Sequence, residues 1–392
     1  MPRTESSARK LKVIRVVTAS YVVPWHLANT LKRMPADFEV TVVGQGVSAY
    51  RDTYPNVRWV DIDLGRKVSL LSDLSALFAL CRIFISIKPD IVHSIMPKAG
   101  LLTALAGFLC RVPVRMHTFT GQVWATRRGL VRWLYRAVDR LIVALNILSM
   151  TDSPSQSAFL LEHGIGHHGN ALPVLSRGSL SGVDLARFHP DDGARQRVRT
   201  ELGIPDGATV FLYLGRLNRD KGILDIAAAF ATLGDAEAHL VLAGPDEENV
   251  VPEAGGLLHS CRHRVHVTGF VQHPEEYFAA ADVFCLPSYR EGFGSVVIEA
   301  AACGLPAIGT RIPGLVDAIE DGVTGMLFAA GDTAELVECM RGLSAHPEKR
   351  RQLGERAMSR AQEYFSAEVL YDALRMQYRS LVEGKMPREC KR

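Results

Sequence analysis

Residues 291–299 read Glu-Gly-Phe-Gly-Ser-Val-Val-Ile-Glu, two carboxylates eight positions apart around a glycine-rich turn. The glycines and Ser295 predict a turn that leads into a helix, and the apolar run that follows predicts the helix itself. Backbone N–H groups at a helix start favour an anion. Glu291 would lie in the loop and Glu299 about two turns along the helix. The two carboxylates can then accept hydrogen bonds from hydroxyls at two points of one ligand.

The part of the chain before this run alternates between strand and helix patterns. Short apolar runs predict strands at Val13–Thr18, Phe38–Val43, Ile91–His93 and Pro113–Thr118, and helical patterns lie at Trp25–Met34, Leu70–Ile87 and Ala99–Cys110. The alternation restarts after a Gly-, Pro- and charge-rich join at 182–207, with strands at Thr209–Leu214, His239–Ala243, Val265–Val267, Val283–Leu286 and Ala307–Gly309. Such alternation predicts parallel sheets covered on both faces.

Two α/β domains with a cleft between them are therefore expected in these 392 residues. We assign 1–10 to a disordered tail, 11–190 to the first domain, 191–365 to the second, and 366–392 to a last helix with a charged tail. Ligands of such sheets gather at the carboxyl ends of the strands.

A polar loop follows the strand 209–214. Gly215 ends the strand, and Arg216 and Lys221 stand in the loop that leads into the next helix. Arg can fork onto phosphate oxygens and Lys adds a point charge, so the pair can clamp a diphosphate. Two surface charges near a turn would give the same pattern, and the loop alone leaves both interpretations open. The strand-plus-glycine segment at Gly269 and Phe270 is weaker still, because turns after strands often use glycine.

Two polar strand ends occur in the first domain. His117 closes one predicted strand, where it could bind a sugar hydroxyl or handle a proton. A buried structural histidine would read the same, and the residue on its own favours that interpretation. His93, with Lys98 at the next helix start, marks the second strand end.

Charge and cysteine content limit the functional classes. The net charge of +3 is too small to indicate nucleic-acid binding. Residues 111–140 nevertheless hold seven Arg and one acid, interleaved with Trp124, Trp133 and Tyr135. This stretch suits anionic lipid headgroups or phosphorylated substrates, and equally a solvated helix face with Arg stems along it.

The seven scattered cysteines, without a Cys-x-x-Cys pair, indicate free thiols and neither a disulfide framework nor a zinc site. The polar N-terminus lacks an apolar signal core. The longest apolar stretches, 74–87 and 99–110, are short for a membrane span. We therefore expect a cytoplasmic protein that can rest on a membrane.

Taken together, the motifs resemble the retaining glycosyltransferases of family 4. The resemblance runs from about residue 12 to residue 380, and its carriers are the 215–222 loop, the 291–299 run, Gly304-Leu305-Pro306 and the Gly322/Gly325 pair. Residues 92–100, 117–126 and 178–184 further resemble a subgroup that builds bacterial surface polysaccharides.

That resemblance implies a GT-B fold, in which two Rossmann-like domains face each other across a deep cleft and the last helix crosses back to the first domain. It implies a nucleotide-diphosphate sugar donor, usually a UDP-sugar. The acceptor would be a saccharide on polyprenyl diphosphate at the inner membrane face. Neither metal nor cofactor would be required.

The resemblance also implies roles for individual residues. Arg216 and Lys221 would hold the diphosphate, Glu299 the ribose, and Glu291 the transferred sugar, with His117 beside that sugar. The remaining donor-side residues are Gly215, Gly269, Phe270, Gly292, Phe293, Gly294 and Ser295. On the acceptor or membrane side we place His93, Lys98, Gln122, Trp124, Arg127, Arg128, Arg132 and Arg136. The segment 18–24 lacks the Gly-Gly pair that many family members carry, so donor contacts from that loop stay unassigned.

Two other functions remain open. A sugar-nucleotide epimerase can share two facing Rossmann-like domains and would act on the donor without an acceptor. A non-catalytic sugar-nucleotide- or membrane-binding protein is the other. The Glu291/Glu299 layout argues against the epimerase, and the joint presence of Arg216, Lys221, Glu291 and Glu299 argues against the binding protein.

Overall fold

The computed structural model describes residues 9–65 and 69–385, and its contacts group into two compact units. The first unit contains the chain up to Asp152, Ser157–Leu175 and the part from Leu370 onward; the second contains Ser153–Gln156 and Ser176–Val369. Residues 176–190, which we assigned to the first domain, thus group with the second unit. The expected tails at 1–10 and beyond 385 lie almost wholly outside the described residues.

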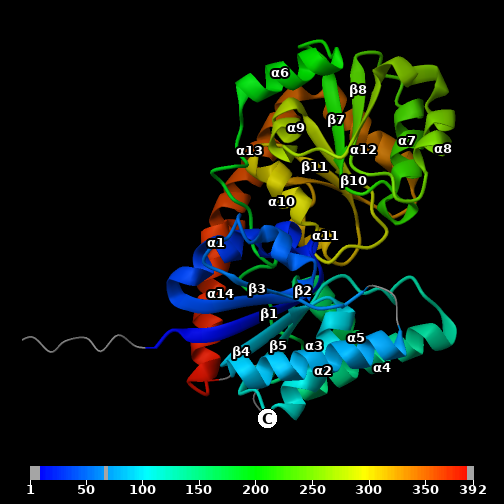
Figure 1. The fold of residues 1–392 in the computed structure, drawn as a ribbon. Helices are drawn as coiled ribbons and strands as arrows, with labels where there is room; N and C mark the ends of the chain where they lie inside the picture. Colours follow the sequence, from blue (N-terminus) through cyan, green and yellow to red (C-terminus); the bar gives the residue numbers. More distant parts are fainter. Residues whose placement is uncertain (1–8, 66–68, 386–392) are drawn as a thin grey trace, which may run out of the picture. The chain divides into compact units, whose positions relative to one another are not determined.

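The first unit is built on a six-stranded parallel sheet with the strand order β3-β2-β1-β4-β5-β6 (Figure 1). Its strands are β1 (Leu11–Ala19), β2 (Phe38–Gln45), β3 (Arg58–Asp61), β4 (Ile91–Ile95), β5 (Val114–Phe119) and β6 (Leu148–Thr151). The four predicted strands are confirmed as β1, β2, β4 and β5. The two edge strands, β3 and β6, were missed because their residues, Arg-Trp-Val-Asp and Leu-Ser-Met-Thr, mix polar and apolar side chains and form no continuous apolar run.

Helices alternate with these strands. They are a π-helical turn η1 (Val23–Leu27), α1 (Ala28–Asp37), a 3₁₀ turn η2 (Val47–Tyr50), α2 (Leu70–Ile87), α3 (Pro97–Leu109), α4 (Gly129–Leu145), α5 (Pro154–Glu162) and α14 (Ala367–Val382). α2 packs on α3, and α3 packs on α4 (Figure 1).

Among the described residues, α2 is the one helix long and apolar enough to cross a bilayer by length and composition. Our expectation that no stretch reaches that length does not hold for α2. Core helices and signal sequences pass the same test, so the property by itself carries no conclusion.

The last helix, α14, belongs to the first unit from Leu370 onward, as the crossing-back helix of a GT-B fold requires. The Tyr371 hydroxyl donates to Asp37 Oδ2 at 2.5 Å, and Arg379 pairs with Asp37 at 2.8 Å. The Tyr378 side chain is completely buried, and its hydroxyl lies 2.7 Å from His93 Nδ1. Side-chain packing and hydrogen bonds therefore fix this helix to the sheet it reaches.

The second unit repeats the design with a parallel sheet in the order β12-β11-β10-β7-β8-β9. Its strands are β7 (Thr209–Leu214), β8 (Ala238–Ala243), β9 (Val265–Gly269), β10 (Val283–Leu286), β11 (Ala307–Thr310) and β12 (Gly325–Phe328). The five predicted strands are confirmed. Edge strand β12 was missed because its four residues follow a glycine-rich turn directly.

The helices of this unit cover both faces of its sheet (Figure 1). They are α6 (Asp192–Leu202), η3 (Arg219–Lys221), α7 (Ile223–Thr232), α8 (Val251–Leu257), η4 (His259–Arg264), α9 (Pro274–Ala280), α10 (Ser295–Ala302), α11 (Leu315–Ala318), α12 (Thr333–Ala345) and α13 (Pro347–Phe365). Asp191 and Asp332 cap α6 and α12 by accepting the N–H groups of Ala194 and Glu335, which fixes where these helices begin.

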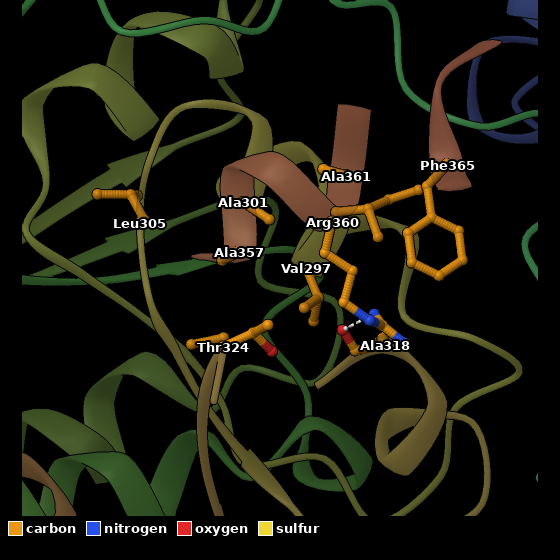
Figure 2. Close-up of a pocket in the computed structure, with 11 residues that line it drawn as sticks. Val297, Ala301, Leu305, Ala318, Thr324, Ala357, Arg360, Ala361 and Phe365 are labelled. Atoms are coloured by element: carbon orange, nitrogen blue, oxygen red, sulfur yellow. Dashed lines mark hydrogen bonds between the residues drawn. The ribbon is translucent and has the colours of Figure 1, made fainter. Parts of the chain in front are cut away.

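A small apolar cavity lies between α10 and α13 (Figure 2). Its volume of about 10 Å³ is that of roughly one water molecule. Arg360 lies across it and donates to the Ala318 carbonyl at 3.1 Å and the Asp317 carbonyl at 2.8 Å. The cavity is a packing gap and too small to hold a substrate.

Candidate active site

The loop after β7 carries Arg216 and is held through its backbone. The Tyr213 hydroxyl donates to the Arg216 carbonyl at 2.8 Å, and the Leu217 N–H donates to the Pro245 carbonyl at 2.8 Å. Asn218 accepts the Lys221 N–H at 3.1 Å. Gly222 then turns the chain with φ 71°, and a Cβ there would lie 2.1 Å from the Pro287 carbonyl oxygen. Only glycine fits this turn, so Lys221 is placed against the loop that follows β10.

Lys221 meets Glu291 although 70 residues separate them. The Lys221 ammonium lies 2.5 Å from Glu291 Oε1, and the Ser288 hydroxyl donates to the same oxygen at 2.8 Å. Both charged side chains are less than one-fifth exposed. The pair stands directly before the start of α10, where an anion is favoured.

Close packing requires glycine in the turn between Glu291 and α10. Gly294 has φ 78°, and a Cβ there would lie 2.6 Å from a methyl carbon of Leu315. Phe293 is buried and packs against Phe365 with ring centroids 5.2 Å apart. The Phe293 side chain is therefore a core residue, and what it offers a ligand is its backbone.

Residues 153–156, which group with the second unit, also hold this turn. The Ser153 hydroxyl donates to the Gly292 carbonyl at 3.0 Å, and Gln156 Nε2 donates to the Glu291 carbonyl at 3.2 Å. The Ser153 hydroxyl also accepts the Gln156 N–H at 3.2 Å and so caps the start of α5. The contact with the glycine turn, 139 residues further on, left no signal in the sequence.

Glu299 lies on α10, partly buried. Burial raises the pKa of this carboxyl to about 7, against the opposing effect of nearby Arg187 and with the support of Glu275. Near neutral pH the group is thus divided between its acid and its carboxylate. The carboxylate accepts hydrogen bonds at both oxygens, whereas the acid has one O–H donor and less acceptor capacity, so the hydrogen bonding open to Glu299 changes near pH 7.

The remaining donor-side predictions lie at neighbouring strand ends. Gly215 ends the β7 segment and donates its N–H to the Ala243 carbonyl at the end of β8. Gly269 ends β9 and accepts the Gly244 N–H at 2.7 Å, and Phe270 after it is about three-quarters exposed. Because β7, β8 and β9 are parallel neighbours, these residues share one edge of the sheet with Arg216.

His117 is buried in the first unit, at the end of β5. Its Nδ1 lies 2.9 Å from the Ser94 hydroxyl, and its ring meets Phe119 edge-on at 4.5 Å. Gly100 of α3 packs so closely that a Cβ there would lie 2.5 Å from the ring. Burial lowers the pKa of His117 to about 3, so the imidazole is neutral and suited to hydrogen bonding rather than to carrying charge.

The other polar residues at these strand ends have partners inside the unit. His93 is buried with Nδ1 on Tyr378 and Nε2 2.8 Å from Thr118 Oγ1. Lys98 pairs with Asp73 at 2.5 Å, which ties α3 to α2. Gln122 is buried and donates to the Thr120 carbonyl at 2.8 Å. In this structure these three side chains brace the unit, and their predicted acceptor role stays a prediction.

The basic stretch divides into two groups. Arg127 and Arg128 are exposed. Arg132 and Arg136 instead stack over Trp124, with guanidinium carbons 5.6 and 5.8 Å from its ring centre, and both donate to His163. The side chains of α4 that face outward are largely apolar.

Trp124 itself is buried, and its indole N–H donates to Asp139 at 2.6 Å. Burial raises the pKa of Asp139 to about 7, and the indole donor opposes this effect. Trp124 and Asp139 therefore form part of the core under α4, and the aromatic surface we predicted has Trp133 as its exposed member.

The described residues contain no group of three or more His, Cys, Asp or Glu side chains arranged to hold a metal ion. The positive charges that we predict for an anion at this site are those of Arg216, Lys221 and the start of α10.

Comparison with known proteins places this chain. Residues 194–360 match the model of the glycosyl transferases of group 1, and residues 20–168 match a glycosyl transferase 4-like domain. A D-inositol 3-phosphate glycosyltransferase from Corynebacterium kroppenstedtii is 32% identical over 79% of this chain and 73% of its own length. The chain belongs to the group 1 glycosyltransferases.

One further relative and one solved structure match nearly the whole of this glycosyltransferase. The capsular polysaccharide biosynthesis glycosyltransferase CapM of Staphylococcus aureus is 26% identical over 95% of this chain and 99% of its own. The solved structure of Anabaena HepE in complex with UDP-glucose matches with a TM-score of 0.78 at 18% identity, over 94% of this chain and all of that one. The structural match establishes the GT-B fold, two Rossmann-like domains.

Within this glycosyltransferase the second unit collects the predicted donor residues. Lys221 and Glu291 touch, and Arg216 and Glu299 lie on the adjoining loop and helix. Three residues of the cluster were not predicted from the sequence: Tyr213, Ser288 and Glu247, whose carboxylate lies 2.9 Å from Arg216 NH1. Tyr213 reads as an ordinary strand residue and Ser288 as part of a turn, so neither carried a signal.

Proposed function

We propose that this glycosyltransferase moves a hexose or N-acetylhexosamine from a UDP-sugar to a saccharide on polyprenyl diphosphate, with retention at the anomeric carbon. The observation that carries the proposal is the Lys221–Glu291 pair directly before α10. A cation for phosphate and a carboxylate for sugar hydroxyls meet there, beside a helix start. HepE binds UDP-glucose in its solved structure, and CapM takes part in making capsular polysaccharide, which supports the donor and acceptor classes.

The proposed reaction separates charge when the glycosidic bond of the donor breaks. Breaking the donor's glycosidic bond leaves negative charge on the departing diphosphate and positive charge on the sugar ring. Arg216, Lys221 and the start of α10 stabilise the departing charge in the transition state, so the reaction proceeds without a metal. A leaving phosphate oxygen takes the proton of the acceptor hydroxyl, and Glu291 serves to hold the sugar.

A lipid-borne acceptor needs an enzyme that reaches the membrane, and the first unit offers a surface for it. Large apolar side chains that are more than half exposed lie along α2, the end of α3 and the start of α4. We call them the apolar helix face: Leu70, Leu71, Leu74, Phe78, Ile85, Phe108, Leu109, Leu130, Val131, Trp133 and Leu134. Exposed apolar patches of this kind mark interaction sites.

The charges around the apolar helix face favour a bilayer as its partner. The acids of these helices point inward, since Asp73 pairs with Lys98 and Asp139 is buried against Trp124. Arg127 and Arg128 remain exposed beside Leu130. Apolar side chains flanked by cations match the acyl boundary and the headgroups of an anionic membrane. Insertion of the apolar helix face then supplies most of the affinity for the membrane, whereas the sequence pointed to the basic and aromatic stretch at 111–140 as the surface that could meet lipid headgroups.

Replacing Leu130, Trp133 and Leu134 together by Ser is expected to weaken binding to phosphatidylglycerol-containing vesicles at least ~10-fold. Inserting each large apolar side chain contributes about 1–3 kcal/mol, so losing three exceeds the ~1.4 kcal/mol of a tenfold change. Vesicle sedimentation measures the effect. The matched control is Leu257→Ser with Met376→Ser, two exposed apolar residues outside this face.

A charge-reversal variant distinguishes insertion of apolar side chains into the bilayer from electrostatic attraction to its headgroups. Arg127→Glu with Arg128→Glu is expected to weaken sedimentation at low salt and to matter much less at ~0.5 M salt, where screening is strong. Unchanged sedimentation of the triple Ser variant would remove the apolar helix face from the proposal.

The transferase itself is tested by a donor screen followed by product analysis. UDP-, GDP- and ADP-glucose are added at pH 8, where Glu299 is largely charged, and a ligand that binds the folded state raises the melting temperature. The donor that binds is then incubated with and without a polyprenyl-diphosphate-linked saccharide. A new glycosidic bond of the donor's anomeric configuration supports the proposal, and an inverted bond contradicts retention.

The same assay separates the two alternative functions. A changed sugar nucleotide in the absence of acceptor would indicate an epimerase. Donor binding without turnover across a broad set of lipid-linked acceptors would indicate a binding protein.

A further inference from the structure

Arg216 already has an anionic partner in the structure. Its NH1 nitrogen lies 2.9 Å from Glu247 Oε2, and both side chains are about one-third exposed. Glu247 belongs to the loop between β8 and α8, and the backbone places it there. Its N–H donates to the Leu217 carbonyl at 3.1 Å, while the Leu217 N–H donates to the Pro245 carbonyl. The carboxylate is thus held in front of the guanidinium by an extension of the sheet.

The two loops approach too closely for Glu247 to lie elsewhere. A Cβ on Gly244 would sit 1.8 Å from the Gly215 carbonyl oxygen, so the β8 loop follows the β7 loop at backbone contact. This close approach carries Glu247 to Arg216 across 31 residues of sequence.

The neighbours of Glu247 have different tasks. Asp246 accepts the Val250 N–H at 2.9 Å at the start of α8, and Glu248 accepts the Arg219 N–H at 3.0 Å. Both therefore support the backbone. The hydrogen bond of the Glu247 side chain is to Arg216. An ion pair about one-third exposed contributes little to folding, about 0–1 kcal/mol. Its position suggests a task in ligand binding.

The charges of the donor site are matched in pairs. Glu247 neutralises Arg216 as Glu291 neutralises Lys221. A diphosphate that takes both cations competes with the Glu247 carboxylate for Arg216, because the two anions repel each other across one guanidinium. Glu291 can keep a role by turning to the sugar hydroxyls, but a carboxylate has nothing to donate to a phosphate.

We propose that Glu247 competes with the nucleotide diphosphate for Arg216, weakening the hold on the leaving diphosphate and speeding its release after transfer. The inference rests on the proposed function of the 216–221 loop. Glu247 acts on the ligand through Arg216, which makes it a positioning residue. Product release often limits kcat in transferases that bind their products tightly, so such a competitor has a direct kinetic use.

The test is Glu247→Gln, which keeps the shape and removes the charge. Titration calorimetry is expected to show UDP binding 3- to 10-fold tighter than in the wild type, and stopped-flow to show a slower dissociation rate. The gain shrinks at high salt. Uridine, which has no phosphate to compete with the carboxylate, binds both proteins equally.

Two variants control for a general charge effect. Glu253→Gln removes a carboxylate that pairs with neighbouring Arg219, at similar exposure, and is expected to leave UDP affinity unchanged. In an Arg216→Gln background, Glu247→Gln is expected to add no affinity, as a double-mutant cycle requires of residues that act through each other.

The outcomes are distinct. A folded Glu247→Gln protein that binds UDP no better than the wild type overturns the proposal, and weaker binding would mean that Glu247 contacts the nucleotide itself. A wild type that binds neither UDP, GDP nor ADP overturns the proposed function, and with it the role of Glu247.

Discussion

Replacing Arg216 or Lys221 by Ala is expected to lower kcat for glycosyl transfer by about 10²–10³ each, the usual effect of losing one preorganised charge partner of a transition state. The structure also predicts which of the two variants loses more activity. Each variant leaves a carboxylate without its cation, Glu247 in Arg216→Ala and Glu291 in Lys221→Ala. The Glu291 side chain is 12% exposed against 37% for Glu247, so solvent screens its charge less beside the incoming diphosphate. The Lys221 variant should therefore lose more activity than the Arg216 variant, in a steady-state assay with the donor identified by the screen.

Two variants make this result specific. Arg219→Ala removes a third cation from the same loop, but Arg219 is exposed and paired with Glu253, so its kcat should stay within about twofold of the wild type. Adding Glu291→Gln to Lys221→Ala removes the stranded charge and should recover part of the donor affinity. Near-normal transfer by folded Arg216→Ala and Lys221→Ala proteins would mean that the loop does not hold the diphosphate.

The sequence predicted the two sheets because their central strands are nearly continuous apolar runs. A parallel strand covered on both faces must be apolar throughout, and β7 and β8 read that way. The three strands that were missed, β3, β6 and β12, lie at sheet edges and have four residues each. An edge strand has one neighbour and needs less apolar side-chain area, so a short run such as Arg58–Asp61 carries too little pattern to be recognised.

Prediction of the site followed the same division between local and distant interactions. Arg216, Lys221, Glu291 and Glu299 come from local motifs whose loop and helix positions the sequence does encode. The inward turn of Arg132 and Arg136 depends on His163 and Trp124, and the role of Glu247 depends on how closely two glycines pass. These are tertiary contacts between residues far apart in the sequence. The local sequence of a basic stretch or an acidic loop does not indicate whether such contacts form.

Asp282 is a further residue whose role no local sequence pattern indicated. Its carboxylate links three segments of the second unit. Its two oxygens accept from Arg195 and Arg199 at 2.7 Å each, and from the Val210 N–H at 2.7 Å. Arg199 is almost completely buried and also donates to the carbonyls of Ala280 and Ala208. The carboxylate thus joins α6 to the start of β7 and to the segment before β10.

Asp282→Ala is expected to destabilise the second unit by about 3–5 kcal/mol, because it leaves the Arg199 guanidinium buried without its counter-charge and the Val210 N–H without an acceptor. Urea unfolding followed by circular dichroism measures the loss. Glu338→Ala is the matched control, since Glu338 pairs with Arg341 at the surface and such pairs contribute under about 1 kcal/mol. Asp282→Asn, which retains an acceptor but not the charge, should fall between the two. A loss below about 1 kcal/mol for Asp282→Ala would mean that the backbone carbonyls around Arg199 compensate its charge alone, and the packing of α6 would then rest on its apolar face.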